Sequence, residues 1–285
     1  MENERNILKR LTGAEDYQIQ VNETGWTSRV YIIDGGKAVF KFPRNAKFRE
    51  ECKREVAVLR LLNERTFGLR VPVLNWTSPD NAYFGFWGVE GKPLKEVIGG
   101  LGVQQKVDIG TQLGHFLQQL HGIKDYGDMK AQTLKEQAKE YHEWFMKGRD
   151  LLKDYFQEFE LHAIDCFFEH DVPKSMTGTG ELVFCHGDLD YNNVLINSNN
   201  QAGVIDFGDA MLYDRSQDFR GMEDAVLLEA MIKAYGGGEV ISREAAAASA
   251  KMIDVLNMIY YIEQNDKAAV HDFAARIRSM MLPLE

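Results

Sequence analysis

Residues 186–210 read HGDLDYNNVLINSNNQAGVIDFGDA, and they carry more information about fold and chemistry than any other stretch of the chain. They place Asp188, Asn193 and Asp206 at spacings of five and thirteen residues. Two short apolar runs flank the polar turn at residues 197–200, a pattern that predicts a β-hairpin. Such a hairpin would bring two carboxylates and one amide oxygen into a small volume.

These oxygen-bearing side chains suit phosphoryl transfer. That reaction needs a carboxylate to orient the acceptor hydroxyl and take its proton, and hard oxygen ligands to hold Mg2+ on the nucleotide phosphates. Asp188 follows a strand-like run and precedes a polar loop, so we expect an exposed catalytic base there. Asn193 and Asp206 are candidate Mg2+ ligands. Each residue alone is typical of a turn or a helix cap, and only their joint spacing favours catalysis.

Lys41 lies between two aromatic residues in an expected strand, so its side chain should face away from theirs. In isolation this pattern is typical of a solvated strand face. With the downstream motif present, Lys41 becomes a candidate for holding the nucleotide phosphates. A helix expected at residues 48–63 carries Glu55, whose carboxylate would fix the lysine; Glu50 and Glu51 compete for this role, but Glu55 adjoins the apolar face of the helix.

The chain divides into a strand-rich part and a helix-rich part. Short β-type runs with turn signals fill the first part, and the linker candidate between the two parts reads GVEGKP. Apolar residues then recur at helical spacing. We therefore predict an α+β, two-lobed fold: a nucleotide-binding lobe with a small antiparallel sheet and one main helix (residues 1–87), a hinge (88–93), and a larger, mostly helical lobe with the catalytic loop and the acceptor site (94–285).

The composition limits the partners. The 285 residues include 43 acidic and 33 basic ones, for a net charge of −10. This acidic balance does not suit a protein that binds nucleic-acid backbones. It is compatible with a cationic small-molecule acceptor, and the alternative is that it only keeps the protein soluble. Three widely spaced cysteines indicate reduced thiols. With no signal-peptide pattern and no membrane-spanning run, we expect a cytoplasmic protein without membrane partners, and a monomer.

The segments His186-Gly-Asp-Leu-Asp-Tyr-Asn-Asn193 and Val204-Ile-Asp-Phe-Gly-Asp209 resemble the Brenner and metal-binding motifs of the aminoglycoside phosphotransferase family. Residues 39–44 and 54–59 resemble its 2″-O-phosphotransferase branch in particular. The resemblance extends over about residues 19–235 and implies a protein-kinase-like fold. It also implies transfer of the γ-phosphoryl group of ATP or GTP, with Mg2+, to a hydroxyl of an aminoglycoside-type acceptor.

The resemblance further implies roles for individual residues. Asp188 would be the catalytic aspartate, Asn193 and Asp206 would bind Mg2+, and Lys41, paired with Glu55, would contact phosphate. Separately from the resemblance, we expect His186 to brace the catalytic loop by hydrogen bonds, although a second base is the alternative, and Asp209 and Asp218 to cap or brace the segment after the metal-binding aspartate.

Two parts of the nucleotide site follow from the same resemblance. The loop at residues 24–29 would cover the nucleotide; it lacks the GxGxxG pattern, and backbone N–H groups near Thr27 and Ser28 would meet a phosphate. The hinge would recognise the nucleobase through its backbone. Its residues are Phe86, Trp87 and Val89, and the two aromatic side chains would narrow the pocket.

The acceptor site is less well defined by the sequence. Glu223 and Asp224 fall on a helix expected at residues 218–235, and acidic residues of this region bind substrate amines in the family that the chain resembles. The alternative is that they lie on a solvated helix face.

Other functions leave different sequence signs. A protein kinase needs a long activation segment, and the path from Ala210 to Asp218 is too short for one. No GxxxxGK[ST] occurs, which excludes a P-loop enzyme. Macrolide, choline, homoserine and sugar kinases carry similar motifs and stay open as alternatives. A regulatory pseudokinase would have lost one of the four chemistry-bearing residues, and all four are present: Lys41, Asp188, Asn193 and Asp206.

Overall fold

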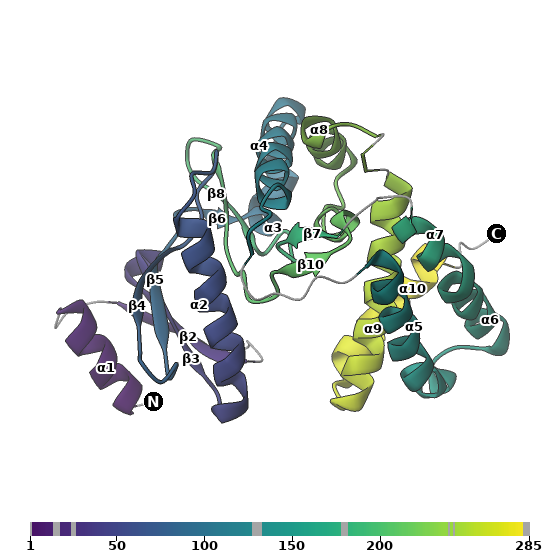
Figure 1. The fold of residues 1–285 in the computed structure, drawn as a ribbon, viewed down its shortest axis with the longest axis horizontal. Coiled ribbons are helices and arrows are strands. Elements are labelled where there is room, and N and C mark those ends of the chain that lie inside the picture. Colours follow the sequence, from purple (N-terminus) through teal and green to yellow (C-terminus); the bar gives the residue numbers. More distant parts are fainter. Residues whose placement is uncertain are drawn as a thin grey trace.

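The chain folds into two lobes that differ in composition (Figure 1). An N-terminal lobe built on a sheet occupies one end of the molecule, and a helical lobe occupies the other, with the β8–β9 hairpin and helix α4 between them. The computed structural model describes residues 2–13, 18–23, 27–126, 133–177, 182–238, 240–241 and 243–281. Residues 24–26, which belong to the expected nucleotide-covering loop, lie outside these ranges. Tyr17 also lies outside them.

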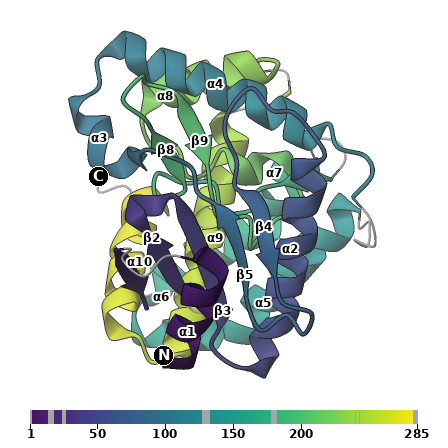
Figure 2. The ribbon, with the colours of Figure 1, turned by 90° about the vertical axis from the view of Figure 1, so that its left-hand side faces the viewer.

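The N-terminal lobe contains a five-stranded antiparallel sheet in the order β1-β2-β3-β5-β4. Along β3, Phe40 and Phe42 face one side of the sheet and Lys41 faces the other, as the alternation predicts. Helix α2 packs on the Lys41 side (Figure 2). The strands are β1 (Ile19–Asn22), β2 (Ser28–Ile33), β3 (Ala38–Pro43), β4 (Val73–Thr77) and β5 (Phe84–Trp87), and the helix is α2 (Arg49–Asn63).

A short N-terminal helix that the sequence patterns did not reveal covers the opposite side of the sheet. This helix, α1 (Glu2–Thr12), contributes Leu8, which is fully buried in a small core with Tyr31 and Phe40. Most of its other residues are polar and exposed, so the apolar stripe is too narrow to signal a helix from the sequence.

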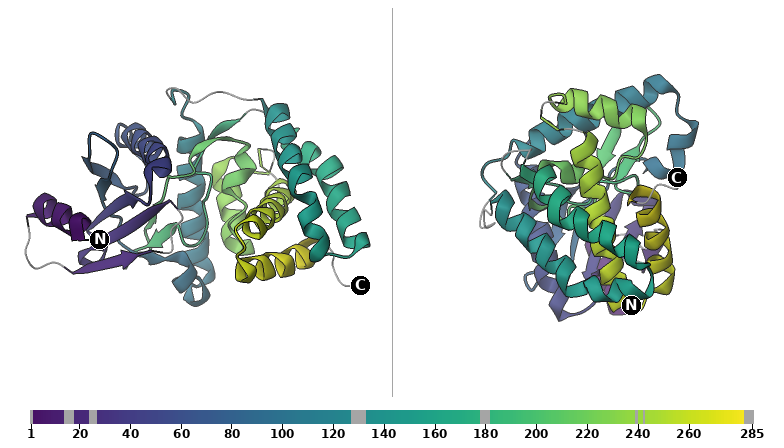
Figure 3. Two further views of the ribbon diagram at one scale, coloured as in Figure 1. Left: turned by 90° about the horizontal axis from the view of Figure 1, so that it is seen from below. Right: turned by 90° about the vertical axis from the view of Figure 1, so that its right-hand side faces the viewer.

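The helical lobe has two hydrophobic cores. Helices α4 and α8 pack with the small strands and share a core with α2, whereas the helices at the far end of the molecule form a separate core (Figure 3). The helices are α3 (Leu94–Val97), α4 (Val103–His121), α5 (Leu134–Gly148), α6 (Glu158–Cys166), α7 (Val172–Thr177), α8 (Ala225–Tyr235), α9 (Arg243–Glu263) and α10 (Lys267–Met281). Among the described helices, none is both long enough and apolar enough to cross a bilayer.

Helices α4 and α8 approach each other closely because two glycines face α8. A Cβ atom on Gly110 would lie 2.3 Å from the carbonyl oxygen of Leu227, and one on Gly114 would lie 2.3 Å from that of Met231. Side chains at these positions would therefore push the helices apart. The close packing fixes the C-terminal end of α4, which carries His121, next to the catalytic loop.

The predicted hairpin is present. Strands β8 (Val194–Ile196) and β9 (Ala202–Val204) pair in antiparallel register. Strand β6 (Lys92–Pro93), formed by the last two residues of the predicted hinge, adds to the edge of β8. Strands β7 (Val183–Cys185) and β10 (Met211–Tyr213) pair just before and just after the motif, so both ends of the segment 186–210 are held in place.

Candidate active site

Lys41 connects the two lobes. Its Nζ lies 2.8 Å from Glu55 Oε1 on α2 and 2.8 Å from Asp206 Oδ1, just after β9. The side chains of Lys41 and Glu55 are only 10% and 8% exposed. The predicted pairing of Lys41 with Glu55 is therefore confirmed as a contact, and Asp206 joins it from the other lobe.

The charges in this group shift one another's pKa. Burial lowers the pKa of Lys41, but the carboxylates of Asp206 and Glu55 outweigh it and hold that pKa above its ordinary value. The lysine charge holds the pKa of Asp206 below its ordinary value. Lys41 and Asp206 are thus both ionised at neutral pH.

Asp188 lies in the loop between β7 and β8, as expected, and its side chain is 47% exposed. Gly187 precedes it with φ +87°, and a Cβ there would lie 2.2 Å from the carbonyl oxygen of Asp209, so the loop requires glycine at this position. Burial raises the pKa of Asp188, although the nearby charge of Arg220 opposes this shift.

Asn193 contacts Asp188 directly. Its Nδ2 donates hydrogen bonds to Asp188 O (2.8 Å) and Asp188 Oδ2 (3.2 Å). This leaves the amide oxygen as the free end of the group, which is the end that binds a cation. The side chain of Asp206 is 51% exposed, and its φ of +65° is rare for a residue other than glycine. An amide oxygen and a carboxylate oxygen are both hard ligands of the kind that Mg2+ prefers.

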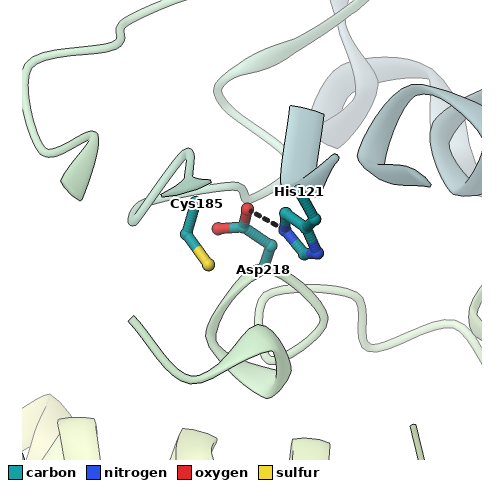
Figure 4. A group of neighbouring side chains, drawn as sticks. All are labelled: His121, Cys185 and Asp218. Carbon is teal, nitrogen blue, oxygen red and sulfur yellow. Dashed lines mark hydrogen bonds and ion pairs between the residues drawn. The ribbon is translucent and has the colours of Figure 1, made fainter. Parts of the chain in front are cut away.

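Asp218 lies beside His121 and Cys185 (Figure 4) and also holds the backbone of the loop that carries Asp188. Its carboxylate accepts hydrogen bonds from His186 N at 2.7 Å and Gly187 N at 2.8 Å. His121 Nε2 lies 3.0 Å from the same carboxylate, and His121 Nδ1 lies 2.8 Å from the hydroxyl of Tyr235. Because a carboxylate only accepts, Nε2 carries the proton and Nδ1 accepts from the tyrosine.

His121, Cys185 and Asp218 are buried and close enough to suggest a metal site. Their hydrogen bonds give another explanation, because both oxygens of Asp218 and both ring nitrogens of His121 have protein partners. Burial also keeps the pKa of the Cys185 thiol well above its ordinary value. We interpret this cluster as a support of the loop.

His186 is fully buried and also supports the loop. Its Nε2 donates to Ile205 O at 2.9 Å, its Nδ1 accepts from Asp188 N, and its ring packs against Phe207. These contacts connect the loop to the strand before Asp206. They agree with the expected bracing role, and they occupy both ring nitrogens.

A cleft of about 560 Å³ brings six of the twelve predicted site residues together. Lys41, Glu55, Asp188 and Asp206 line it, as do Thr27 and Ser28 of the nucleotide-covering loop. Asn193 adjoins it through its bonds to Asp188. Further lining residues come from α5, from the segment after β9 and from α9, and include Trp144, Asp209, Tyr213, Gln217, Arg220, Ile253, Asn257, Tyr260 and Tyr261.

The expected hinge residues are not among the described residues that line this cleft. Phe86 and Val89 are buried. Trp87 packs against Trp76 with ring centroids 4.7 Å apart, on the side of the sheet that faces away from Lys41, and it is 48% exposed. The expectation that its ring narrows the nucleotide pocket is therefore corrected, because alternation along β5 turns it outward.

Asp224 and Glu223 also lie outside the described lining of the cleft. Asp224 caps α8: its Oδ1 accepts hydrogen bonds from Val226 N and Leu227 N, and its Oδ2 pairs with Lys106 at 2.7 Å. The helix accordingly begins at Ala225, later than expected. Glu223 is exposed just before the cap. The structure thus gives Asp224 a role in helix formation, and the expected contact of Glu223 and Asp224 with substrate stays a prediction.

Arg220 and the aromatic residues of α5 and α9 are the site residues that sequence reasoning missed. On α9, residues 253, 257, 260 and 261 recur at helical spacing and share one face, which is the signal that could have grouped them. Arg220 carries no such signal. It reaches Asp188 because the core residue Phe219 and the loop-bracing Asp218 fix the backbone just before it.

The two-lobed fold with Lys41, Asp188 and Asp206 in one cleft defines a protein-kinase-like phosphotransferase. Sequence comparison assigns the family: the family model described as the phosphotransferase enzyme family matches residues 18–252, and the chain belongs to this family. It is thus a phosphotransferase with an alcohol group as acceptor, and the predicted family is confirmed. No curated protein sequence matches the chain.

Solved structures confirm the fold. The GDP and kanamycin complex of APH(2″)-IIIa superposes with a TM-score of 0.82 at 18% identity, covering 98% of each chain. The macrolide 2′-phosphotransferase MphH from Brachybacterium faecium gives 0.69 at 18% identity, also covering 98% of each. The choline kinase LicA from Streptococcus pneumoniae gives 0.65 at 14% identity over the whole of both chains. At these identities the similarity establishes the kinase-like fold.

Proposed function

We propose that the protein is a small-molecule kinase that transfers the γ-phosphoryl group of ATP or GTP to a hydroxyl group, with Mg2+ as cofactor. The observation that carries this proposal is the meeting of Lys41 and Asp206 with the Asp188–Asn193 pair in one cleft. The first pair suits phosphate and metal, and the second suits the acceptor hydroxyl. APH(2″)-IIIa, which has the same fold, is described in complex with GDP.

The chain's residues divide the work of one displacement. Asp188 orients the acceptor hydroxyl and accepts its proton as the acceptor oxygen forms a bond to the γ-phosphorus. The bond between that phosphorus and the β–γ bridging oxygen breaks, and the nucleoside diphosphate leaves with the electron pair. Lys41 holds the phosphates and Glu55 holds Lys41 in place, so catalysis rests on positioning and electrostatics.

Asn193 and Asp206 would hold Mg2+. Their oxygens fit this ion. The amide nitrogen of Asn193 is bonded to Asp188, which leaves the amide oxygen to bind a cation, and the carboxylate of Asp206 is ionised and half-exposed. The bound ion supplies positive charge against the phosphate oxygens.

For the acceptor we propose an aminoglycoside-type molecule. The acidic net charge favours a cation, and Asp209 adds a carboxylate to the cleft beside Asp188. APH(2″)-IIIa is described in complex with kanamycin.

A second class of acceptor is favoured by the aromatic wall of the cleft. Trp144, Tyr213, Tyr260 and Tyr261 line the cleft, and Ile253 adds an aliphatic side chain. Such a wall binds apolar ring systems or a single quaternary ammonium group better than a polyamine. Macrolide and choline kinases, which have the same fold, are the corresponding alternatives.

A transfer assay separates these possibilities. Purified protein with Mg2+ and either ATP or GTP is offered kanamycin, a macrolide, choline, homoserine and simple sugars, and the phosphorylated product is detected by mass spectrometry. We expect phosphorylation of kanamycin. Phosphorylation of only another compound would replace the acceptor, whereas the absence of nucleotide binding and of any transfer would overturn the kinase proposal itself.

A further inference from the structure

Arg220 occupies an unusual position beside the expected catalytic base. Its Nη2 lies 3.4 Å from Asp188 Oδ1, and its Nη1 donates to Gly187 O at 3.1 Å and to Gln217 O at 3.2 Å. The side chain is 13% exposed and lines the cleft. Two carbonyl oxygens therefore hold the guanidinium in place, while the edge nearer Asp188 makes a longer contact than a close ion pair, whose distance is about 2.8 Å.

The charges around the catalytic loop make this arginine distinctive. Residues 187–193 read GDLDYNN, which contains two carboxylates and no cation. Among the described residues that line the cleft, the cations are Lys41, Arg54 and Arg220. The first two belong to the N-terminal lobe, and Lys41 is already bound by two carboxylates. Arg220 is the one that shares a lobe with Asp188.

The reaction places negative charge where this cation lies. The acceptor oxygen attacks from beside Asp188, so the γ-phosphoryl group must pass within reach of the same carboxylate. Negative charge on the transferred oxygens then meets the negative charge of Asp188. A guanidinium fixed at the edge of this carboxylate reduces the repulsion and can bind two oxygens at once.

Resting on the kinase function proposed above, we propose that Arg220 is a catalytic residue whose guanidinium binds the γ-phosphoryl oxygens during transfer. The proton of the acceptor hydroxyl goes to Asp188, the new oxygen–phosphorus bond forms, and the nucleoside diphosphate leaves. Arg220 exchanges no proton in this step. It shifts its outer edge from Asp188 toward the phosphoryl oxygens while the two carbonyl contacts keep it anchored.

The test uses a transition-state mimic that needs no known acceptor. Aluminium fluoride with Mg2+ and GDP or ADP imitates the planar transferred group, and its binding is compared with that of the Mg2+–diphosphate alone by calorimetry. Arg220→Met should weaken the fluoride complex by about 100-fold while changing diphosphate binding by less than about 3-fold, because the lost contact forms only with the transferred group. Where kanamycin is phosphorylated, kcat should fall by a similar factor with little change in the KM of the nucleotide.

Two further variants make the result interpretable. Arg220→Lys keeps the positive charge but loses the planar guanidinium that binds two oxygens at once, so the affinity of its fluoride complex should lie between those of wild type and Arg220→Met. This variant also provides the test if the methionine variant fails to fold. Arg243→Met removes an exposed arginine that pairs with Glu229 outside the cleft and should leave both affinities unchanged.

The possible outcomes separate this proposal from the kinase proposal. Equal weakening of both complexes, or of neither, would show that Arg220 does not bind the transferred group. Selective weakening without transfer to any compound offered would support the role of Arg220 and overturn only the choice of acceptor. If wild-type protein binds no Mg2+–diphosphate, both proposals fail.

Discussion

His121 and Asp218 lie 97 residues apart in the chain and share a buried hydrogen bond of 3.0 Å. Asp218 also receives the N–H groups of His186 and Gly187, and His121 is held in turn by the hydroxyl of Tyr235. The loop that carries Asp188 is therefore fixed by helices α4 and α8. The geometry of the reaction depends on residues that never touch a substrate.

Asp218→Asn should lower both stability and turnover. The substitution places an amide N–H₂ where two backbone N–H groups and His121 need acceptors, and an unsatisfied buried donor costs about 1–3 kcal/mol. We expect a lower Tm and a lower kcat, measured by circular dichroism and by the transfer assay. Asp272→Asn, at a side chain that is 84% exposed, is the matched control. A variant with wild-type Tm and kcat would contradict the bracing role.

Asp188→Asn should abolish most of the turnover and leave the fold intact. The amide cannot accept the hydroxyl proton, and loss of a general base lowers kcat by about 100- to 10,000-fold. Nucleotide affinity should change little, because Lys41 and Asp206 are untouched. Product formation under saturating substrates and nucleotide binding by calorimetry check the two parts. Normal turnover would remove Asp188 from the mechanism.

Lys41→Met should destabilise the protein strongly and weaken nucleotide binding. It leaves Glu55 buried without its cation and facing Asp206, and breaking a buried ion pair costs about 3–5 kcal/mol. Adding Glu55→Gln removes the stranded charge, so the double variant should be more stable than Lys41→Met alone. Urea unfolding of the wild type and the three variants forms a double-mutant cycle. Simple additivity would mean that the pair is not coupled.

Asp254 on α9 should make stability depend on pH. Burial raises its pKa from 3.8 to about 6, although Arg276 lies 3.0 Å away, and among the described residues its Oδ2 has no hydrogen-bond partner. At a pH between the unfolded and folded pKa values of Asp254, this carboxyl binds more protons in the folded chain than in the unfolded chain. The contribution of this group therefore falls as pH rises from about 4 to about 6 and stays low above that range.

Asp254→Asn should remove this dependence. At pH 7 the variant should be more stable than wild type by up to about 3 kcal/mol, because one pKa unit corresponds to about 1.4 kcal/mol, and the difference should vanish near pH 4. Urea unfolding at a series of pH values measures both. A constant difference at every pH would point to packing and not to protonation.

The sequence was informative where function depends on short-range patterns. The hairpin between Asn193 and Asp206 could be predicted because a polar turn separates two apolar runs. Lys41 and Glu55 could be paired because strand and helix periodicities fix which way each side chain points.

Contacts between distant segments could not be read in this way. His121 reaches Asp218 only because α4 packs against α8 through two glycines, and no local pattern encodes that meeting. Asp224 illustrates the converse, since an acidic residue before an apolar helix serves equally as a cap or as a ligand. The bonds to Val226 N and Leu227 N show the cap, which the sequence could not distinguish from the alternative.

The aromatic wall stands on different elements from the reacting groups. Trp144 lies on α5, and Ile253, Tyr260 and Tyr261 lie on α9, whereas Lys41 and Asp188 belong to β3 and to the loop after β7. Libraries randomised at these four wall positions would vary what the cleft accepts without altering the support of the base. The enzyme is therefore a convenient starting scaffold for directed evolution toward new phosphorylated products.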